Sequence, residues 1–327
     1  MNDGPCMVSV LCTAFNHENY IRQTLESFLM QKTNFRFEVL INDDCSTDGT
    51  AAIIREYEEK YPEIIRPFYQ EKNLFSQGMG VIYHTVLYPA AQGRYFAYCE
   101  GDDCWTDPEK LQLQVDFMES HPEYTACVHN TQLLFCTGRE ENRLLREVEE
   151  DHDVGLANII RGMESSYHTS SLLVRSEYLK NLPDYYDVGA SYGFLDHPMA
   201  FWFCSNGPIR FLNRTMSMYR IDSGASAWSS GVHGQYAKLC RFINGKIALL
   251  KAFKPYSPEE FYPLIEEYIL RHEFELMYIE GRDMEQRKAP YSAFLKEKPF
   301  SYRCNNFIKA YFPWIQKLYR GLKGYHE

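Results

Sequence analysis

The first 135 residues alternate between short apolar runs and amphipathic stretches, and this alternation limits the possible folds more than any other feature. The runs at 8–12, 37–41 and 95–99 are too short for helices, and they are separated by stretches with apolar residues at helical spacing. Strands that alternate with helices build βαβ units, whose strands lie side by side in a sheet. The pattern predicts an α/β fold with a mostly parallel sheet flanked by helices.

Individual elements can be placed from the same periodicity. Ile21, Leu25 and Phe28 lie on one face of a helix after the first strand. A second helix ends before Pro62. We also expect a third strand at 65–69, a helix at 81–91, and a strand at 124–135.

The alternation stops in the last third of the chain. Residues 139–153 are dominated by charge and predict an exposed loop. Beyond about Tyr236 helical patterns take over, as in 261–269. We therefore expect an α/β domain at 1–235 and a helical C-terminal segment at 236–327.

Composition excludes several classes of protein. With 24% charged and 15% aromatic residues the chain is globular rather than disordered. Its net charge of -10 disfavours nucleic acid as a partner and would repel an anionic ligand. A phosphate-bearing substrate therefore needs a local cation.

The ten cysteines are scattered, without the paired C-x-x-C spacing of zinc sites, and most are expected to be buried free thiols. Because we find neither a signal peptide nor an apolar stretch long enough to cross a bilayer, we expect a cytoplasmic protein.

An acidic group directly follows the run at 95–99, in the sequence Glu100-Gly101-Asp102-Asp103. Adjacent carboxylates repel each other, so burying them requires a cation, hydrogen bonds or a proton. Mg²⁺ or Mn²⁺ suits this role because each prefers oxygen ligands and leaves positions open for phosphates. A solvated acidic turn is the alternative.

Other polar residues follow the first two strands, namely Thr13 and the pair Asp43-Asp44. In open α/β sheets ligands bind outside the carboxyl ends of the strands, so one site can gather these residues and the acidic group. Asp43 or Asp44 could accept a hydrogen bond from the imide N–H of uracil. Residues 46–48 have a simpler alternative role as caps of the following helix.

Three segments then match a known family in order. Residues 8–16 look like an opening strand and a Thr/Pro-x-Tyr-Asn turn, with Phe15 in place of Tyr. Residues 42–50 are similar to an Asp-Asp-Gly-Ser-Thr-Asp-Gly-Thr segment, and 93–103 to the strand that delivers a DxD-type motif. Over about 7–230 the chain resembles glycosyltransferase family 2, the inverting enzymes of the Rossmann-like GT-A (nucleotide-diphospho-sugar transferase) fold, of the bacterial surface-polysaccharide type.

The resemblance implies a role for each matched position. Thr13, Phe15 and Asp44 would border the nucleobase. Asp102 would face the ribose or the metal, and Asp103 would ligate Mn²⁺ or Mg²⁺ on the diphosphate.

Neighbouring positions depart from the family pattern or leave two roles open. Glu100 stands where many relatives carry Asp, and its longer side chain is not counted as a ligand. Trp105 stacks on a sugar ring or belongs to the core. Asp222 occupies the place of a family His that faces metal or diphosphate. Arg220 beside it either binds phosphate oxygens or forms a surface ion pair.

Inversion also requires a base for the acceptor hydroxyl, and the resemblance favours Asp196. Leu195 replaces the usual first acid of this motif. Asp196 could instead cap the helix that follows it, and both roles are compatible. His197 is the rival base, since its ordinary pKa suits proton transfer at neutral pH.

The last stretch, 296–327, carries seven Lys or Arg against two Glu, interleaved with aromatic residues. It predicts an element that lies on anionic lipid, and the alternative is a helix packed on the catalytic domain. Contact with the inner face of the cell membrane would suit a lipid-linked acceptor.

Together these features imply a metal-dependent inverting glycosyltransferase of the hexosyltransferase type. It would move a sugar from a nucleotide-diphosphate sugar, expected to be a UDP-sugar, to a glycan or lipid-linked hydroxyl in cell-surface polysaccharide synthesis. One rival is a catalytically silent GT-A scaffold or glycan-binding protein. A nucleotidyltransferase is disfavoured because no Gly-rich basic loop follows the first strand, and an oxidoreductase because G-x-G-x-x-G is missing there.

Overall fold

The structure is a computed structural model that describes residues 4–78, 80–136, 142–162, 167–180, 182–193, 196–221 and 236–312. The chain divides into two compact units, 1–233 and 234–327.

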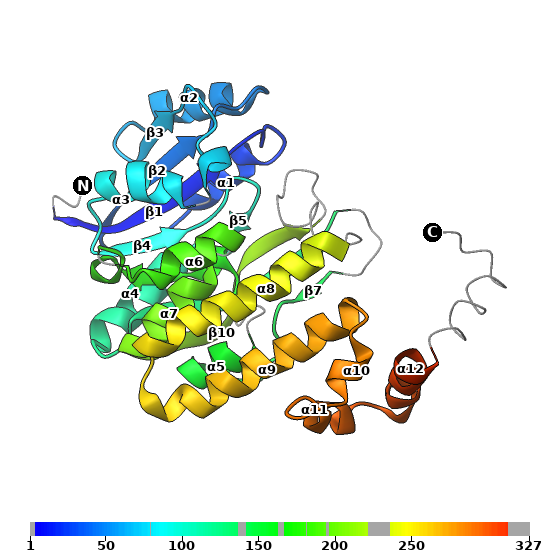
Figure 1. Cartoon of the computed structure of the whole chain (residues 1–327). Coiled ribbons are helices and arrows are strands. Elements are labelled where there is room, and N and C mark those ends of the chain that lie inside the picture. The colour runs from blue at the N-terminus through cyan, green and yellow to red at the C-terminus, as the bar shows by residue number, and fades with distance from the viewer. Residues whose placement is uncertain are drawn as a thin grey trace. The chain divides into compact units, whose positions relative to one another are not determined.

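The N-terminal unit is built on one sheet flanked by helices (Figure 1). Strands β3, β2, β1 and β4 are parallel neighbours, whereas β9 runs antiparallel to both β4 and β6. The α/β prediction is confirmed, and the antiparallel insertion of β9 is a feature that the alternation did not predict. In sheet order the strands are β3 (Ile65–Tyr69), β2 (Arg36–Asp43), β1 (Cys6–Ala14), β4 (Tyr95–Tyr98), β9 (Leu173–Arg175), β6 (Ala126–Phe135), β10 (Ile209–Ile221) and β5 (Cys104–Trp105).

Two short strands lie in the charged stretch predicted to be a loop. β7 (Arg143–Leu144) pairs with β6, and β8 (His152–Val154) pairs with β10. Most of the described residues there are nevertheless exposed.

The helices of this unit follow the predicted apolar faces, and α1 buries Ile21, Leu25 and Phe28. The stretch predicted as a helix at 81–91 contains a π-helical turn, Tyr83–Leu87, followed by the short α3 (Tyr88–Ala90). Besides α3, the α-helices of this unit are α1 (Ile21–Leu29), α2 (Thr50–Lys60), α4 (Lys110–Ser120), α5 (Leu156–Arg161), α6 (Tyr185–Tyr192) and α7 (Asp196–Asn206).

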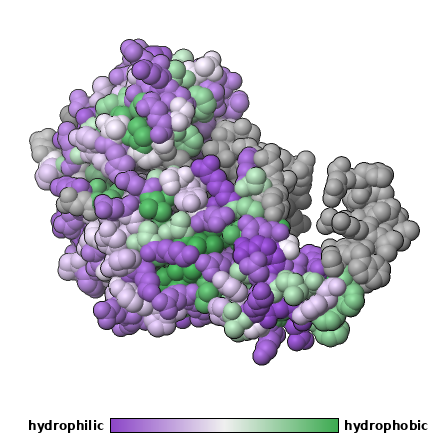
Figure 2. Space-filling model, viewed as in Figure 1, coloured by the Kyte–Doolittle hydropathy of each residue, from purple (hydrophilic) through white to green (hydrophobic). Residues whose placement is uncertain are grey.

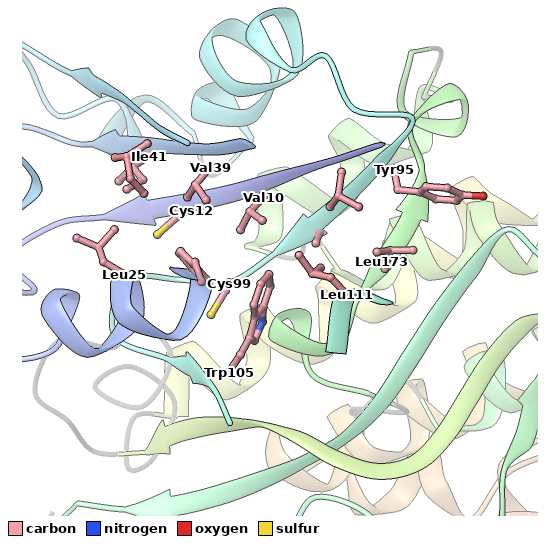
Figure 3. Packing of buried hydrophobic residues seen from close by; sticks show 14 of the residues in the cluster. Val10, Cys12, Leu25, Val39, Ile41, Tyr95, Cys99, Trp105, Leu111 and Leu173 are labelled. Atoms are coloured by element: carbon pink, nitrogen blue, oxygen red, sulfur yellow. The ribbon is translucent and has the colours of Figure 1, made fainter. Parts of the chain in front are cut away.

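The core lies between the sheet and the helices, where Val10, Cys12, Cys99 and Leu111 are fully buried (Figure 3). Trp105 belongs to this core. It is 2% exposed, its ring packs edge-on against Phe28, and its Nε1 donates to the Ser170 carbonyl at 2.9 Å. Stacking of Trp105 on a sugar is therefore excluded, because the ring is already enclosed by protein.

The C-terminal unit is helical, as predicted. No helix among the described residues is both long and apolar enough to cross a lipid bilayer. Its α-helices are α8 (Tyr236–Phe253), α9 (Tyr262–Ile279), α10 (Asp283–Gln286), α11 (Ser292–Glu297) and α12 (Phe300–Tyr311).

Candidate active site

The acidic loop 100–103 follows β4 and is held against the end of β1 and against α1. The Gly101 N–H donates to the Thr13 carbonyl at 2.8 Å, and the Thr24 hydroxyl lies 2.6 Å from the Asp103 carbonyl oxygen. A Cβ at Gly101 would lie 2.8 Å from His17 Nδ1 and 3.1 Å from the Ala14 Cβ, so the loop needs glycine here. The backbone thus positions the carboxylates.

These carboxylates are crowded. Burial raises the pKa of Glu100 to about 7, and the charges of Asp102 and Asp196 add to the effect. Burial and the same Asp102 charge, together with Glu100, raise the pKa of Asp103 well above its usual range. Glu100 Oε2 is buried without a hydrogen-bond partner. Because Asp102 and Asp103 are only 6% and 1% exposed, the solvated-turn alternative is wrong for this pair.

Arg220 on β10 supports the loop from inside the protein. Its backbone N–H donates to Asp103 Oδ1 at 3.1 Å, and its guanidinium donates to the Asp102 carbonyl and to Gln23 Oε1. Because Arg220 is only 4% exposed, the surface ion pair is excluded. The neighbouring Asp222 lies outside the described residues.

The two candidate uracil acceptors differ in their surroundings. Asp44 accepts from the backbone N–H groups of Leu74 and Phe75 at 2.7 and 3.0 Å, so it fixes the segment after β3. Asp43 Oδ1 is buried with no hydrogen-bond partner. Phe15, 42% exposed, follows the end of β1, the strand that is paired with β2 up to Asp43.

Asp48 lies one residue before Gly49, the N-cap of α2, and its side chain binds the start of that helix. Its carboxylate accepts from the Thr50 N–H at 2.9 Å, at the start of α2, and also from the Glu18 N–H at 3.1 Å. Ser46 Oγ accepts from the Asn16 N–H at 2.9 Å. These residues join the turns that follow β1 and β2.

Asp196 is the first residue of α7 and is paired with its neighbour. His197 approaches Asp196 Oδ1 with its N–H at 2.9 Å and its Nδ1 at 3.1 Å. The Asp196 side chain is 48% exposed. Its partial burial works to raise its pKa, but the His197 charge and hydrogen bonds lower it to about 2. Phe194 and Leu195 lie outside the described residues.

The charge of Asp196 also acts on residues at the acidic loop. Its charge raises the pKa of Glu100 and opposes the lowering of the His168 pKa. The candidate base thus shares a neighbourhood with the loop, although 96 positions separate it from Glu100 in the sequence.

Two histidines also lie at the site, and neither was predicted as a neighbour of the acidic residues. His168 stacks on Tyr219 with ring centroids 4.0 Å apart, and its Nδ1 lies 3.8 Å from Asp103 Oδ2. Burial lowers the pKa of His168 to about 4, so this contact is not an ion pair at neutral pH.

The second, His17, has its Nδ1 buried without a hydrogen-bond partner. Burial lowers its pKa, while the charges of Asp102, Asp48 and Asp43 oppose that change. His17 directly follows the family segment 8–16, and this adjacency was the signal that could have indicated it.

Within the described ranges, no three His, Cys, Asp or Glu side chains form a ready-made metal site. The donor chemistry nevertheless fits a hard cation, since repelling carboxylates with raised pKa values are stabilised by positive charge. Such an ion would take its remaining ligands from substrate phosphate oxygens.

Comparison with known sequences identifies the family. The sequence model of glycosyl transferase family 2 matches residues 9–181, more than half of the chain. The chain belongs to glycosyltransferase family 2.

Three bacterial relatives illustrate the similarity. The uncharacterized protein Rv1520 of Mycobacterium tuberculosis is 34% identical over 213 residues, 65% of this chain and 58% of that protein. The chain thus matches somewhat more than half the length of this relative. The putative teichuronic acid biosynthesis glycosyltransferase TuaG of Bacillus subtilis is 41% identical over 36% of this chain and 44% of its own. The UDP-Glc:alpha-D-GlcNAc-diphosphoundecaprenol beta-1,3-glucosyltransferase WfaP of Escherichia coli is 34% identical. That match covers 35% of this chain and 42% of WfaP.

Solved structures show the same GT-A fold. S. aureus TarS in complex with UDP has a TM-score of 0.55 at 18% identity, covering 90% of this chain and 93% of that one. The mannosyltransferase PcManGT from Pyrobaculum calidifontis, in complex with GDP-Man and Mn²⁺, has a TM-score of 0.52 at 17% identity. The match covers 94% of this chain and 86% of PcManGT. At these identities the likeness concerns the fold alone.

Proposed function

We propose that this protein is a metal-dependent inverting glycosyltransferase that moves a hexosyl group from a UDP-sugar to a hydroxyl of a glycan or lipid-linked acceptor in cell-surface polysaccharide synthesis. The supporting observation is the crowded acidic loop 100–103, which is coupled electrostatically to Asp196. The UDP bound to TarS and the named activities of WfaP and TuaG support the donor and acceptor classes.

On the donor side, Asp103 and Asp102 would hold Mn²⁺ or Mg²⁺, and the ion would offset the negative charge on the departing diphosphate. The Mn²⁺ complex of PcManGT supports this choice of cation. Phe15 and Thr13 would border the base, with Asp43 or Asp44 as acceptor of its imide N–H. Arg220 acts indirectly, because it holds the Asp102 carbonyl.

On the acceptor side, Asp196 would remove the proton of the attacking hydroxyl. A new bond forms between that oxygen and the anomeric carbon while the bond to the diphosphate breaks on the opposite face, so the configuration inverts. With a pKa of about 2, Asp196 is ionised at neutral pH and can accept a proton. His197 holds its carboxylate, which supports an orienting role for the histidine that was the rival base.

We also propose where in the cell the protein acts. We place the protein in the cytoplasm, with peripheral contact to the inner face of the membrane through 296–327, where a lipid-linked acceptor would be available. The division into a GT-A catalytic domain, 1–235, and a helical C-terminal segment, 236–327, is part of the same proposal.

The test is donor consumption by purified protein. UDP-sugars are screened with Mn²⁺ and with EDTA, using Asp103→Asn and Asp196→Asn as variants. The control is Asp116→Asn, since Asp116 is an exposed residue of α4. We expect consumption that requires the cation and Asp103. If the wild type neither binds nor consumes any nucleotide sugar, the catalytically silent scaffold is the correct interpretation.

A further inference from the structure

The outer face of α12 carries a row of exposed aromatic side chains. Phe300, Phe307 and Tyr311 are 74%, 44% and 50% exposed, and Phe312 just beyond the helix is 41% exposed. Spacings of seven and four residues place the three helical positions on one face. Figure 2 shows pale green, apolar residues among purple, hydrophilic ones in this region.

The opposite face of α12 is fixed inside the C-terminal unit, so the aromatic row cannot simply turn inward. Asn306 is fully buried, and its Nδ2 donates to Gln286 Oε1 at 2.7 Å. Arg287 donates to Asn306 Oδ1 at 2.9 Å, and the rings of Tyr302 and Tyr278 lie 5.0 Å apart. These contacts leave the aromatic row on the outside.

Positive charges accompany the exposed rings. The guanidinium carbon of Arg303 lies 5.9 Å from the Phe300 ring, and that of Arg287 lies 5.1 Å from Phe307 and 5.4 Å from Tyr311. α12 itself contains no Asp or Glu. This combination occurs in a chain whose net charge is -10.

We propose that the aromatic row of α12 binds the surface of an anionic lipid bilayer. A bilayer surface offers an apolar layer for the rings and, in the same plane, anionic headgroups for Arg303. The inference gives a defined surface to the peripheral contact proposed above. It does not depend on the transfer chemistry, since binding is measured without donor or acceptor.

The test is co-sedimentation of the full chain with vesicles of phosphatidylcholine alone or mixed with phosphatidylglycerol. We expect binding to the anionic vesicles that weakens as salt increases. Phe300→Ser with Phe307→Ser should lower the affinity about 10- to 100-fold, because two large rings lose their apolar contact. Arg303→Gln should lower it about fivefold.

The matched control is Tyr256→Ser, which removes an aromatic residue of similar exposure, 46%, from the same unit but outside α12. It should bind vesicles like the wild type, and all variants should show the wild-type unfolding transition. The proposal is overturned if the wild-type protein does not bind anionic vesicles, or if the Phe300→Ser, Phe307→Ser double variant binds them like wild type. Self-association that the double variant abolishes, without vesicle binding, assigns the face to a second copy instead. Vesicle binding by protein that consumes no donor would leave this inference standing and reject the transferase.

Discussion

Replacing Glu100 by Gln tests whether electrostatic repulsion in the acidic loop lowers the stability of the folded protein. In the folded protein burial and the Asp102 charge raise the pKa of Glu100 from an ordinary 4.5 to about 7. The folded state therefore keeps this proton between about pH 4.5 and 7, whereas the unfolded state loses it. Stability accordingly falls as the pH rises through this window and then levels off.

The magnitude follows from the two pKa values. At about 1.4 kcal/mol per pH unit, the ionised Glu100 costs about 3 kcal/mol above pH 7. Gln keeps the size of the side chain and removes the charge. The variant should therefore be more stable than wild type at pH 8, by up to about 3 kcal/mol, and nearly equal at pH 4.5.

The assay is denaturant unfolding with EDTA across this pH range, again with Asp116→Asn as the exposed control. Added Mn²⁺ should stabilise wild type more at pH 8 than at pH 5, because the cation replaces the proton as the partner of the carboxylates. A Glu100→Gln protein that is less stable than wild type at pH 8, or that keeps the full wild-type pH slope, would refute the reasoning.

Three further variants test other parts of the site. Asp196→Asn should reduce transfer about 10²- to 10⁴-fold while calorimetry shows unchanged UDP binding; equal turnover would exclude Asp196 as base. His168→Ala, which removes the imidazole beside Asp103, should raise the Mn²⁺ concentration needed for donor consumption about 10- to 100-fold, and Mn²⁺ titration checks this. Lys110 is fully buried, and burial lowers its pKa to about 7 from 10.5. Wild-type stability should thus rise between pH 7 and 10.5, and Lys110→Met should abolish that rise in unfolding curves.

The fold was predictable wherever it depends on local pattern. Each apolar run became a strand, and the strand at Ile65–Tyr69 has the predicted bounds. The helix expected at 81–91 contains a π-helical turn instead, because packing can change the hydrogen-bond pattern of a helix without changing its apolar face.

The candidate site was predictable only in part. The acidic loop, Asp43 and Asp44 could be proposed from the sequence because they lie at the carboxyl ends of strands, which meet at one edge of the sheet. That His168 lies beside Asp103 was not predicted. His168 comes shortly before β9 in the chain, and the sequence pattern does not indicate that β9 runs antiparallel between β4 and β6.

By itself, the sequence determined the order of strands and helices, the adjacency of Glu100, Asp102 and Asp103, and the family motifs, because periodicity and neighbouring charges are local properties of a chain. Only the tertiary structure decided that Trp105 and Arg220 are buried and that Asp196 is coupled to Glu100. Desolvation and Coulomb interactions depend on distances in space, and these are set by how the strands assemble.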